Sequence, residues 1–221
     1  MKLKQFIVPP VQARREAGAD GGNALIDGLI NYRAEDGRAL GDNEIADQLV
    51  CVMSGGLEAV AKVSAQGIME LWKRPDQLAA VRADLETNIP IAVEEIVRYC
   101  APAQYTIRTA HKDAIIAGQP VRAGQRVACM LYSAARDERE FDNPDTFIWD
   151  RPIERVISFG LGQHHCIGKH VGLLEVRTLV REFLARVDSF EILVDRAVRN
   201  PSCFQRGYIH VPVVIGGSHE V

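Results

Sequence analysis

The sequence predicts a mainly α-helical fold with a small β-sheet, and three observations support this class. Apolar residues recur at helical spacing from residue 42 to residue 72, which is a length of roughly 45 Å for an unbroken helix. Two further helical patterns, after Arg74 and after residue 166, follow later in the chain. Between residues 102 and 127 the pattern changes to short alternating or apolar runs closed by glycine and proline, which is typical of strands.

The composition is that of an ordinary globular protein, with 221 residues, 47% hydrophobic residues and 25% charged residues. A net charge of -3 and the lack of a basic block argue against nucleic-acid binding. Five widely spaced cysteines predict free thiols and a reducing compartment rather than a disulfide framework. The N-terminal apolar run is short and is interrupted by Pro9 and Pro10, so we expect no membrane anchor and a cytoplasmic protein.

The first 72 residues predict two helices. Leu25, Ile26 and Leu29 share one face of a short helix within residues 12–32, and glycines precede it. The long helix begins near Gly41, where Glu44 stands three residues later in the spacing of a capping box.

Two adjacent glycines, Gly55 and Gly56, lie in the middle of this long helix. Each costs about 1 kcal/mol of helix stability relative to alanine. That cost predicts a close approach of another group or a local distortion of the helix. Simple packing against a neighbouring helix is the alternative interpretation.

A glycine-rich loop, residues 158–168, precedes the last helical pattern. Gly160 and Gly162 are suited to the positive φ angles of a tight turn. Cys166 follows them at the predicted start of a helix, where the dipole favours a thiolate, and a thiolate beside a flat cavity suits a haem iron. The helix is predicted from apolar residues that recur at roughly helical spacing: Ile167, Val171, Leu174, Leu179, Phe183 and Val187. A buried structural cysteine and a zinc site with the neighbouring histidines are the alternatives, although no second cysteine pair has zinc-finger spacing.

The run from Phe159 to Gly168 reads F-G-x-G-x-H-x-C-x-G and resembles the haem-binding loop of the cytochrome P450 family of haem-thiolate monooxygenases. The resemblance implies haem b as the cofactor and Cys166 as the iron ligand. It also implies that Phe159 packs beside the sulfur and that His164 contacts a haem propionate. Gly160 and Gly168 would leave room for the haem.

The glycine pair of the long helix resembles the family's distal motif, A/G-G-x-D/E-T, in the order Gly55, Gly56, Leu57 and Glu58. In the family the acid and the threonine manage protons during oxygen activation. Ala59 occupies the position of the threonine, and an alanine side chain neither donates nor accepts a hydrogen bond. The resemblance therefore implies catalytic roles for Gly56, Glu58 and position 59, with a changed proton supply.

Three further matches concern support and haem contact. Glu95 and Arg98 form the family's E-x-x-R pair, and Arg151 matches a later arginine that joins the pair in the core. Glu94 also has helical spacing to Arg98, so an exposed surface pair is the alternative for this helix. Arg108, in a predicted strand, matches the residue that binds the second propionate; the alternative is a strand arginine in solvent.

The resemblance covers residues from about 12 to 215 and corresponds to the C-terminal part of the family's fold. It implies that residues 1–221 are a single truncated haem-thiolate domain without the family's N-terminal lid portion. The implied reaction inserts one oxygen atom from O2 into a hydrophobic small molecule, with electrons from a ferredoxin or flavoprotein reductase. Residues 104–107 would border the substrate pocket and Phe204 would lie on its substrate side. The alternatives are a peroxide-driven or substrate-assisted oxidase, suggested by Ala59, and an inactive haem-binding fragment.

Overall fold

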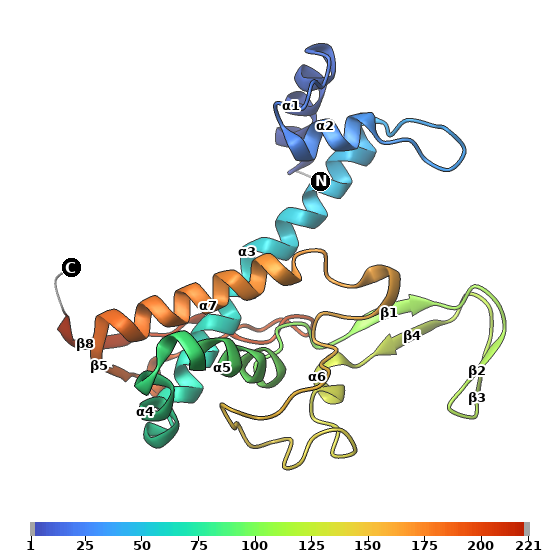
Figure 1. The fold of residues 1–221 in the computed structure, drawn as a ribbon. Helices are drawn as coiled ribbons and strands as arrows, with labels where there is room; N and C mark the ends of the chain where they lie inside the picture. Colours follow the sequence, from blue (N-terminus) through green and yellow to red (C-terminus); the bar gives the residue numbers. More distant parts are fainter. Residues whose placement is uncertain (1–2, 219–221) are drawn as a thin grey trace. The chain divides into compact units, whose positions relative to one another are not determined.

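The computed structural model describes residues 3–218, and its helices and strands follow one another as Figure 1 shows. The chain divides within helix α3 (Asp42–Trp72) into two compact units, residues 1–58 and residues 59–221. The described part is mainly helical with short antiparallel strand pairs, which confirms the fold class predicted from the sequence.

The first unit contains α1 (Lys4–Glu16), α2 (Ala24–Asn31) and the beginning of α3. The side chain of Asn23 caps α2 by accepting a hydrogen bond from the Ile26 amide at 3.0 Å. The predicted cap of α3 is present, because Glu44 Oε2 accepts from the Gly41 amide at 2.8 Å. The small core of the unit is formed by apolar residues of all three helices and the α1–α2 loop: Val11, Ala19, Ile30, Ile45 and Leu49.

Helix α1 contains Pro9 and Pro10 in its interior. A proline removes one backbone donor and its ring clashes with the preceding turn, so it is a strong sign of a helix end. Here the prolines lie on the exposed side of α1, while Val11 of the same helix is fully buried. Tertiary burial of the apolar face stabilises the helix against the local cost.

A buried carboxylate ties the first unit together. Asp27 is 1% exposed, and its two oxygens accept hydrogen bonds from Arg14 Nε at 3.0 Å and Arg14 Nη2 at 2.6 Å. The backbone amides of Gly21 and Asn23 each donate to it at 3.0 Å. The Arg14 guanidinium, followed by these amides, lowers the pKa of Asp27 to about 2.

The second unit contains the rest of α3 and a series of later helices and short strands. Its α-helices after α3 are α4 (Pro75–Ala83), α5 (Leu85–Tyr99), α6 (Leu131–Ala134) and α7 (Lys169–Arg186). The 3-10 segments are η1 (Gly162–His164) and η2 (Val194–Arg196). The first four strands are β1 (Thr106–Thr109), β2 (Ala114–Ile116), β3 (Gln119–Val121) and β4 (Arg126–Cys129). The last four are β5 (Val187–Ile192), β6 (Val198–Arg199), β7 (Tyr208–His210) and β8 (Val213–Ser218).

The strands pair in four antiparallel ladders: β1 with β4, β2 with β3, β5 with β8 and β6 with β7. In the first ladder Arg108 lies opposite Val127, and in the second Ile115 lies opposite Pro120. The small sheet predicted between residues 102 and 127 therefore takes the form of two short two-stranded ladders.

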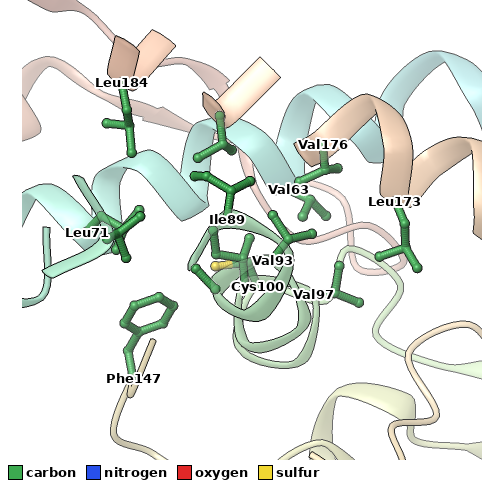
Figure 2. Packing of buried hydrophobic residues seen from close by; sticks show 14 residues of the cluster. Val63, Leu71, Ile89, Val93, Val97, Cys100, Phe147, Leu173, Val176 and Leu184 are labelled. Carbon is green, nitrogen blue, oxygen red and sulfur yellow. The ribbon is translucent and has the colours of Figure 1, made fainter. Parts of the chain in front are cut away.

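The core of the second unit lies between α3, α5 and α7, and Figure 2 shows the apolar side chains of these helices meeting there. Helices α3 and α5 approach closely at Gly67: a Cβ atom added to Gly67 would lie 2.6 Å from Ile96 Cγ2. Real Cβ atoms do not come so close to another carbon, so this position requires glycine. The close approach expected at Gly55 and Gly56 occurs instead at Gly67, twelve residues from Gly55.

Gly55 and Gly56 themselves lie in unbroken helix, and no other group lies within 4 Å of a Cβ built at either position. The sequence-based expectation of a close approach or a distortion is therefore wrong for the protein alone. The two glycines lower the stability of the helix, and no packing contact within the described residues offsets this loss.

Helix α5 begins at Leu85, where Asp84 Oδ1 accepts a hydrogen bond from the Thr87 amide at 3.1 Å and caps the helix. Helix α7 begins at Lys169, three residues later than the start predicted at Cys166.

Helix α7 buries one of its two apolar sides. Its inward side chains are Leu173, Val176, Val180 and Leu184. Four of the apolar residues whose spacing predicted the helix, Ile167, Val171, Leu174 and Leu179, are exposed. Apolar residues occupy both sides of this helix, so helical spacing alone does not determine which side is buried.

Candidate functional site

The cysteine loop folds back on itself through three backbone hydrogen bonds. The Gly160 amide donates to Ile157 O at 2.8 Å, and the Cys166 amide donates to Phe159 O at 2.8 Å. The His165 amide donates to Gly162 O at 2.9 Å. Both glycines have a φ of 72°, a conformation that residues with a Cβ atom rarely adopt. The tight turn predicted from the two glycines is therefore confirmed, and it holds Cys166 in a defined place.

Cys166 is exposed and its thiol is free. It lies in the turn between η1 and α7, and its carbonyl accepts a hydrogen bond from the Lys169 amide at 3.3 Å. Gly168, the residue before α7, leaves the space beside the sulfur open, because an added Cβ atom would lie 3.9 Å from Cys166 Sγ. The sulfur is thus accessible to a ligand, and a Cβ atom at position 168 would contact it.

The other predicted residues of the loop differ in exposure. Phe159 is partly buried and packs against the apolar core of the second unit, and the Lys169 ammonium lies 5.8 Å from the centre of its ring. His164 is exposed at the end of η1. The loop is therefore anchored to the core through Phe159, while Cys166 and His164 face outward.

Arg108 lies on strand β1 and is exposed. Its Nη1 donates to the neighbouring Ile107 carbonyl at 3.1 Å. Among the described residues no hydrogen bond or ion pair joins Arg108 to His164. Arg108 and His164 come from separate segments of the second unit. Both side chains are exposed, so each is available to bind an anionic group of a ligand.

The predicted support is assembled around Glu95, which has no exposed surface. Glu95 Oε2 accepts from Arg98 Nε at 2.6 Å, and Glu95 Oε1 accepts from Arg98 Nη2 at 2.8 Å, so the pair is bidentate. Arg151 Nε lies 3.2 Å from Glu95 Oε2, and the Ile148 amide donates to Glu95 Oε1 at 2.9 Å. The structure thus brings Glu95, Arg98 and Arg151 together, with one carboxylate serving two guanidinium groups.

The remaining donors of the two arginines bind backbone carbonyls of residues 135–146. Arg98 Nη1 donates to Ala135 O at 2.7 Å and to Pro144 O at 2.9 Å. Arg151 donates to the carbonyls of Asp142, Asn143 and Thr146. Sequence analysis missed these acceptors, and no side-chain signal could have identified them because every residue carries a carbonyl. The irregular segment before the cysteine loop is held through its backbone.

Glu94, the neighbouring acid, has a different environment. Its side chain is 36% exposed, and its Oε1 accepts from Arg177 Nη2 of α7 at 3.1 Å. Glu95 and not Glu94 is therefore the carboxylate that binds Arg98. The alternative of an exposed surface pair for Arg98 is excluded by the complete burial of Arg98.

The residues of the predicted distal motif lie on both sides of the division in α3. Gly55, Gly56, Leu57 and Glu58 belong to the first unit and are exposed, with Leu57 at 71%. Ala59 is half-buried and belongs to the second unit. The surface of the helix is open beside the two glycines, so a large planar group could lie against it there.

These residues fit a haem. An exposed thiol in a turn held by three hydrogen bonds offers a sulfur ligand, and Gly168 leaves room beside it. His164 and Arg108 are exposed donors for carboxylates. Within the part of the chain that the structure describes, no three His, Cys, Asp or Glu side chains gather closely enough to hold a metal ion alone, which argues against the zinc alternative.

The comparisons with known proteins agree with this geometry. The sequence pattern of the family described as "Cytochrome P450" matches residues 1–212. The steroid C26-monooxygenase of Mycolicibacterium smegmatis is 32% identical over 87% of this chain, and the cytochrome P450-terp of a Pseudomonas species is 35% identical over 71%. The solved structure of cytochrome P450 CYP109Q5 from Chondromyces apiculatus, 28% identical, covers 97% of the chain with a TM-score of 0.85.

The chain belongs to the cytochrome P450 family, and this membership implies a haem cofactor. It spans 48% and 36% of the length of the two curated relatives and 54% of the solved structure. No helix among the described residues has the length and apolar character needed to cross a membrane.

Proposed function

We propose that this chain provides the haem-thiolate part of a monooxygenase that inserts one oxygen atom from O2 into a hydrophobic small molecule. The observation that carries the proposal is the exposed Cys166 thiol, held in a glycine turn that is anchored to the core. When bound, haem b would supply the oxygen chemistry that no side chain of the protein can provide.

The residues around Cys166 bind and orient the cofactor. Cys166 Sγ would ligate the iron as a thiolate, and the Phe159 ring would pack beside the sulfur. His164 and Arg108 would hold the two propionates through charge-assisted or neutral hydrogen bonds. Gly160 and Gly168 would leave space for the macrocycle beside the cysteine loop, and by resemblance to the family Gly55 would leave space for it on the distal helix. Glu95, Arg98 and Arg151 keep the segment before the cysteine loop in place.

The distal helix supplies protons. Glu58 is the only ionisable side chain of the distal motif, and its carboxyl group can hold and release a proton at Oε1 or Oε2. Gly56 has no side chain, so it would leave the helix surface next to Glu58 open to the oxygen ligand. Ala59 cannot donate or accept a proton, so the relay has one member fewer than the family's usual pattern.

The substrate and the electron donor are proposed from the relatives. The name of the M. smegmatis relative describes it as a steroid monooxygenase, which supports a hydrophobic small-molecule substrate for this protein. A ferredoxin or a flavoprotein reductase would supply the electrons, because the sequence contains no flavin or dinucleotide motif.

The experiment that tests the proposal is the reduced carbon-monoxide spectrum of the chain purified with added haem. A strongly red-shifted Soret band is expected, because a thiolate donates electron density to the iron. Cys166→Ser should abolish the shift, and Cys203→Ser, the loss of another exposed thiol, should keep it. An unshifted band in the unchanged chain, or no retained haem, would overturn the proposal and favour an inactive remnant of the family.

A second candidate function is oxidation driven by hydrogen peroxide, and Ala59 is the observation that favours it. Peroxide already carries the two electrons and protons that O2 must otherwise receive, so the missing alcohol would matter less. Turnover with O2 and reductant should increase in Ala59→Thr, measured as product formed per reductant consumed, whereas turnover with peroxide should not. An unchanged ratio of product to reductant would remove Ala59 as the limiting defect.

A further inference from the structure

Lys62 is a buried cation on α3 that the haem-binding residues do not explain. Its residue is 8% exposed, and its Nζ donates a hydrogen bond to Gln205 Oε1 at 2.7 Å. Lysine is rarely buried unless its ammonium group is paired, because removing the charge from water is costly. The contact joins two parts of the second unit that are 143 residues apart in the sequence.

Gln205 belongs to a turn, residues 200–207, that is closed by its own hydrogen bonds. The Asn200 amide donates to Gly207 O at 3.0 Å, and Asn200 Nδ2 donates to Gln205 O at 3.1 Å. Ser202 Oγ accepts from the amides of Phe204 and Gln205. These hydrogen bonds fix the shape of the turn, whereas its position is set by contacts with other segments of the chain.

Two attachments fix the turn. On one side the Gln104 amide donates to Phe204 O at 2.9 Å, and the Arg206 amide donates to Pro102 O at 2.7 Å. On the other side the stem of Lys62 lies against Gly207, where an added Cβ atom would be 3.1 Å from Lys62 Cβ and Cγ. The Lys62 ammonium therefore completes a second attachment, to α3, through both packing and a hydrogen bond.

The turn presents Phe204, which is 44% exposed and meets Tyr105 edge to face at 5.6 Å between ring centres. Together the two rings form an aromatic corner attached to α3 through the neighbouring Gln205. We propose that Lys62 is a positioning residue that sets this corner for ring-bearing apolar substrates. The inference rests on the proposed function for the substrate, but the contact between Lys62 and Gln205 can be tested without haem.

Hydrogen exchange of the chain without haem tests the attachment. A buried hydrogen bond from a charged group stabilises its partners enough that Lys62→Met should accelerate exchange of the Gln104 and Arg206 amides by about 10- to 100-fold. Lys73→Met is the matched control, because Lys73 is an exposed lysine in the turn directly after the same helix and pairs with Glu70 at 2.8 Å. It should leave both amides unchanged.

Variants of Gln205 separate the hydrogen bond from simple packing. Gln205→Glu keeps an oxygen acceptor for the ammonium and should preserve the slow exchange, whereas Gln205→Leu should lose it. Equal exchange in Lys62→Met and Lys73→Met, or a loss of protection in Gln205→Glu as large as in Gln205→Leu, would overturn the proposal. Unchanged exchange of the α5 amides verifies that the variants are folded.

A ligand pair tests the consequence for the aromatic corner in the haem-loaded chain. Imidazole and 4-phenylimidazole both bind haem iron through a ring nitrogen, and only the second carries a phenyl ring, which the proposal places against Phe204. The preference for 4-phenylimidazole should fall about three- to ten-fold in Lys62→Met, the range expected for losing one aromatic contact. An unchanged preference would show that Lys62 does not set the corner. Failure of the proposed function would appear separately, as the absence of the thiolate spectrum in the unchanged chain.

Discussion

Glu95 and Cys166 lie in the same unit at opposite extremes of exposure. Around Glu95, two guanidinium groups and one amide bind a single carboxylate that has no exposed surface. Around Cys166, the backbone is held by hydrogen bonds while the thiol itself is exposed. The two regions differ in where their polar groups find partners. The buried carboxylate is hydrogen-bonded within the protein, whereas the thiol of the loop is left available to a ligand.

The two regions should therefore respond differently to substitution. A change in the buried centre removes partners that nothing else can replace, so it should lower stability. A change in the open regions should alter ligand binding and change stability by no more than about 1 kcal/mol. The following experiments test this contrast.

The largest effect is expected from Glu95→Ala. It leaves Arg98 buried without its carboxylate, and breaking such a pair costs about 3–5 kcal/mol. Urea unfolding followed by circular dichroism measures the loss. The control is Glu94→Ala, because Glu94 is partly exposed and pairs with Arg177, so its removal should cost about 1 kcal/mol or less. Equal losses in the two variants would show that Glu95 is not the centre of the support.

Gly67→Ala should give the next largest effect. The added methyl would lie 2.6 Å from Ile96 Cγ2, and overpacking of this kind costs about 1–3 kcal/mol. Alanine regains about 1 kcal/mol of helix propensity, so a net loss of up to about 2 kcal/mol is expected. The midpoint of thermal unfolding measures it. Gly67→Ala combined with Ile96→Val should recover part of the loss; no recovery would contradict the steric explanation.

Gly55→Ala should have the opposite sign. Nothing lies within 4 Å of an added Cβ atom, so the variant should gain about 1 kcal/mol of stability from helix propensity. If Gly55 leaves room for haem, the same variant should retain less haem after gel filtration. A more stable chain with unchanged haem retention would remove Gly55 from the proposed cofactor site.

Thiol labelling leaves the sequence unchanged and compares Cys166 with Cys100 directly. Cys100 is 2% exposed, and burial raises the pKa of its thiol to about 12. With a maleimide at pH 7, mass spectrometry should find Cys166 modified in the folded chain and Cys100 modified only after unfolding. Labelling of both at similar rates would show that the core opens as easily as the loop.

The same pKa shift has a consequence for stability. The folded pKa of Cys100 lies above the ordinary thiol value, so its contribution to stability is complete at neutral pH. This contribution decreases as pH rises above about 9 and is lost as pH approaches 12, because the unfolded chain then releases a proton that the folded chain retains.

Much of the site could be predicted from sequence because its signals are local. Gly160 and Gly162 indicate a turn by themselves, and the structure places both at positive φ. Glu95 and Arg98 are three residues apart on a helix, so they are neighbours in any fold that contains the helix. Arg151 was predicted only through resemblance to a family, because a contact between residues 56 positions apart has no local signal.

Other features could not be read from the chain. Gly55, Gly56 and Gly67 are identical residues in one helix, yet only Gly67 meets another helix. The apolar residues of α7 occupy two faces, and helical spacing does not show which of them is buried. Lys62 resembles any surface lysine in the sequence, and its burial against the turn at Gln205 appears only when the chain is folded.

The sequence by itself determined the helical class, the glycine turn before Cys166 and the spacing of the E-x-x-R pair. Each depends on residues within about four positions of one another, where backbone geometry is fixed by covalent connection. The tertiary structure alone decided which helix faces are buried, which glycine is required and which lysine lies in the interior. These choices depend on the side chains of a second element, and the free energy of burial exists only when both elements are in contact.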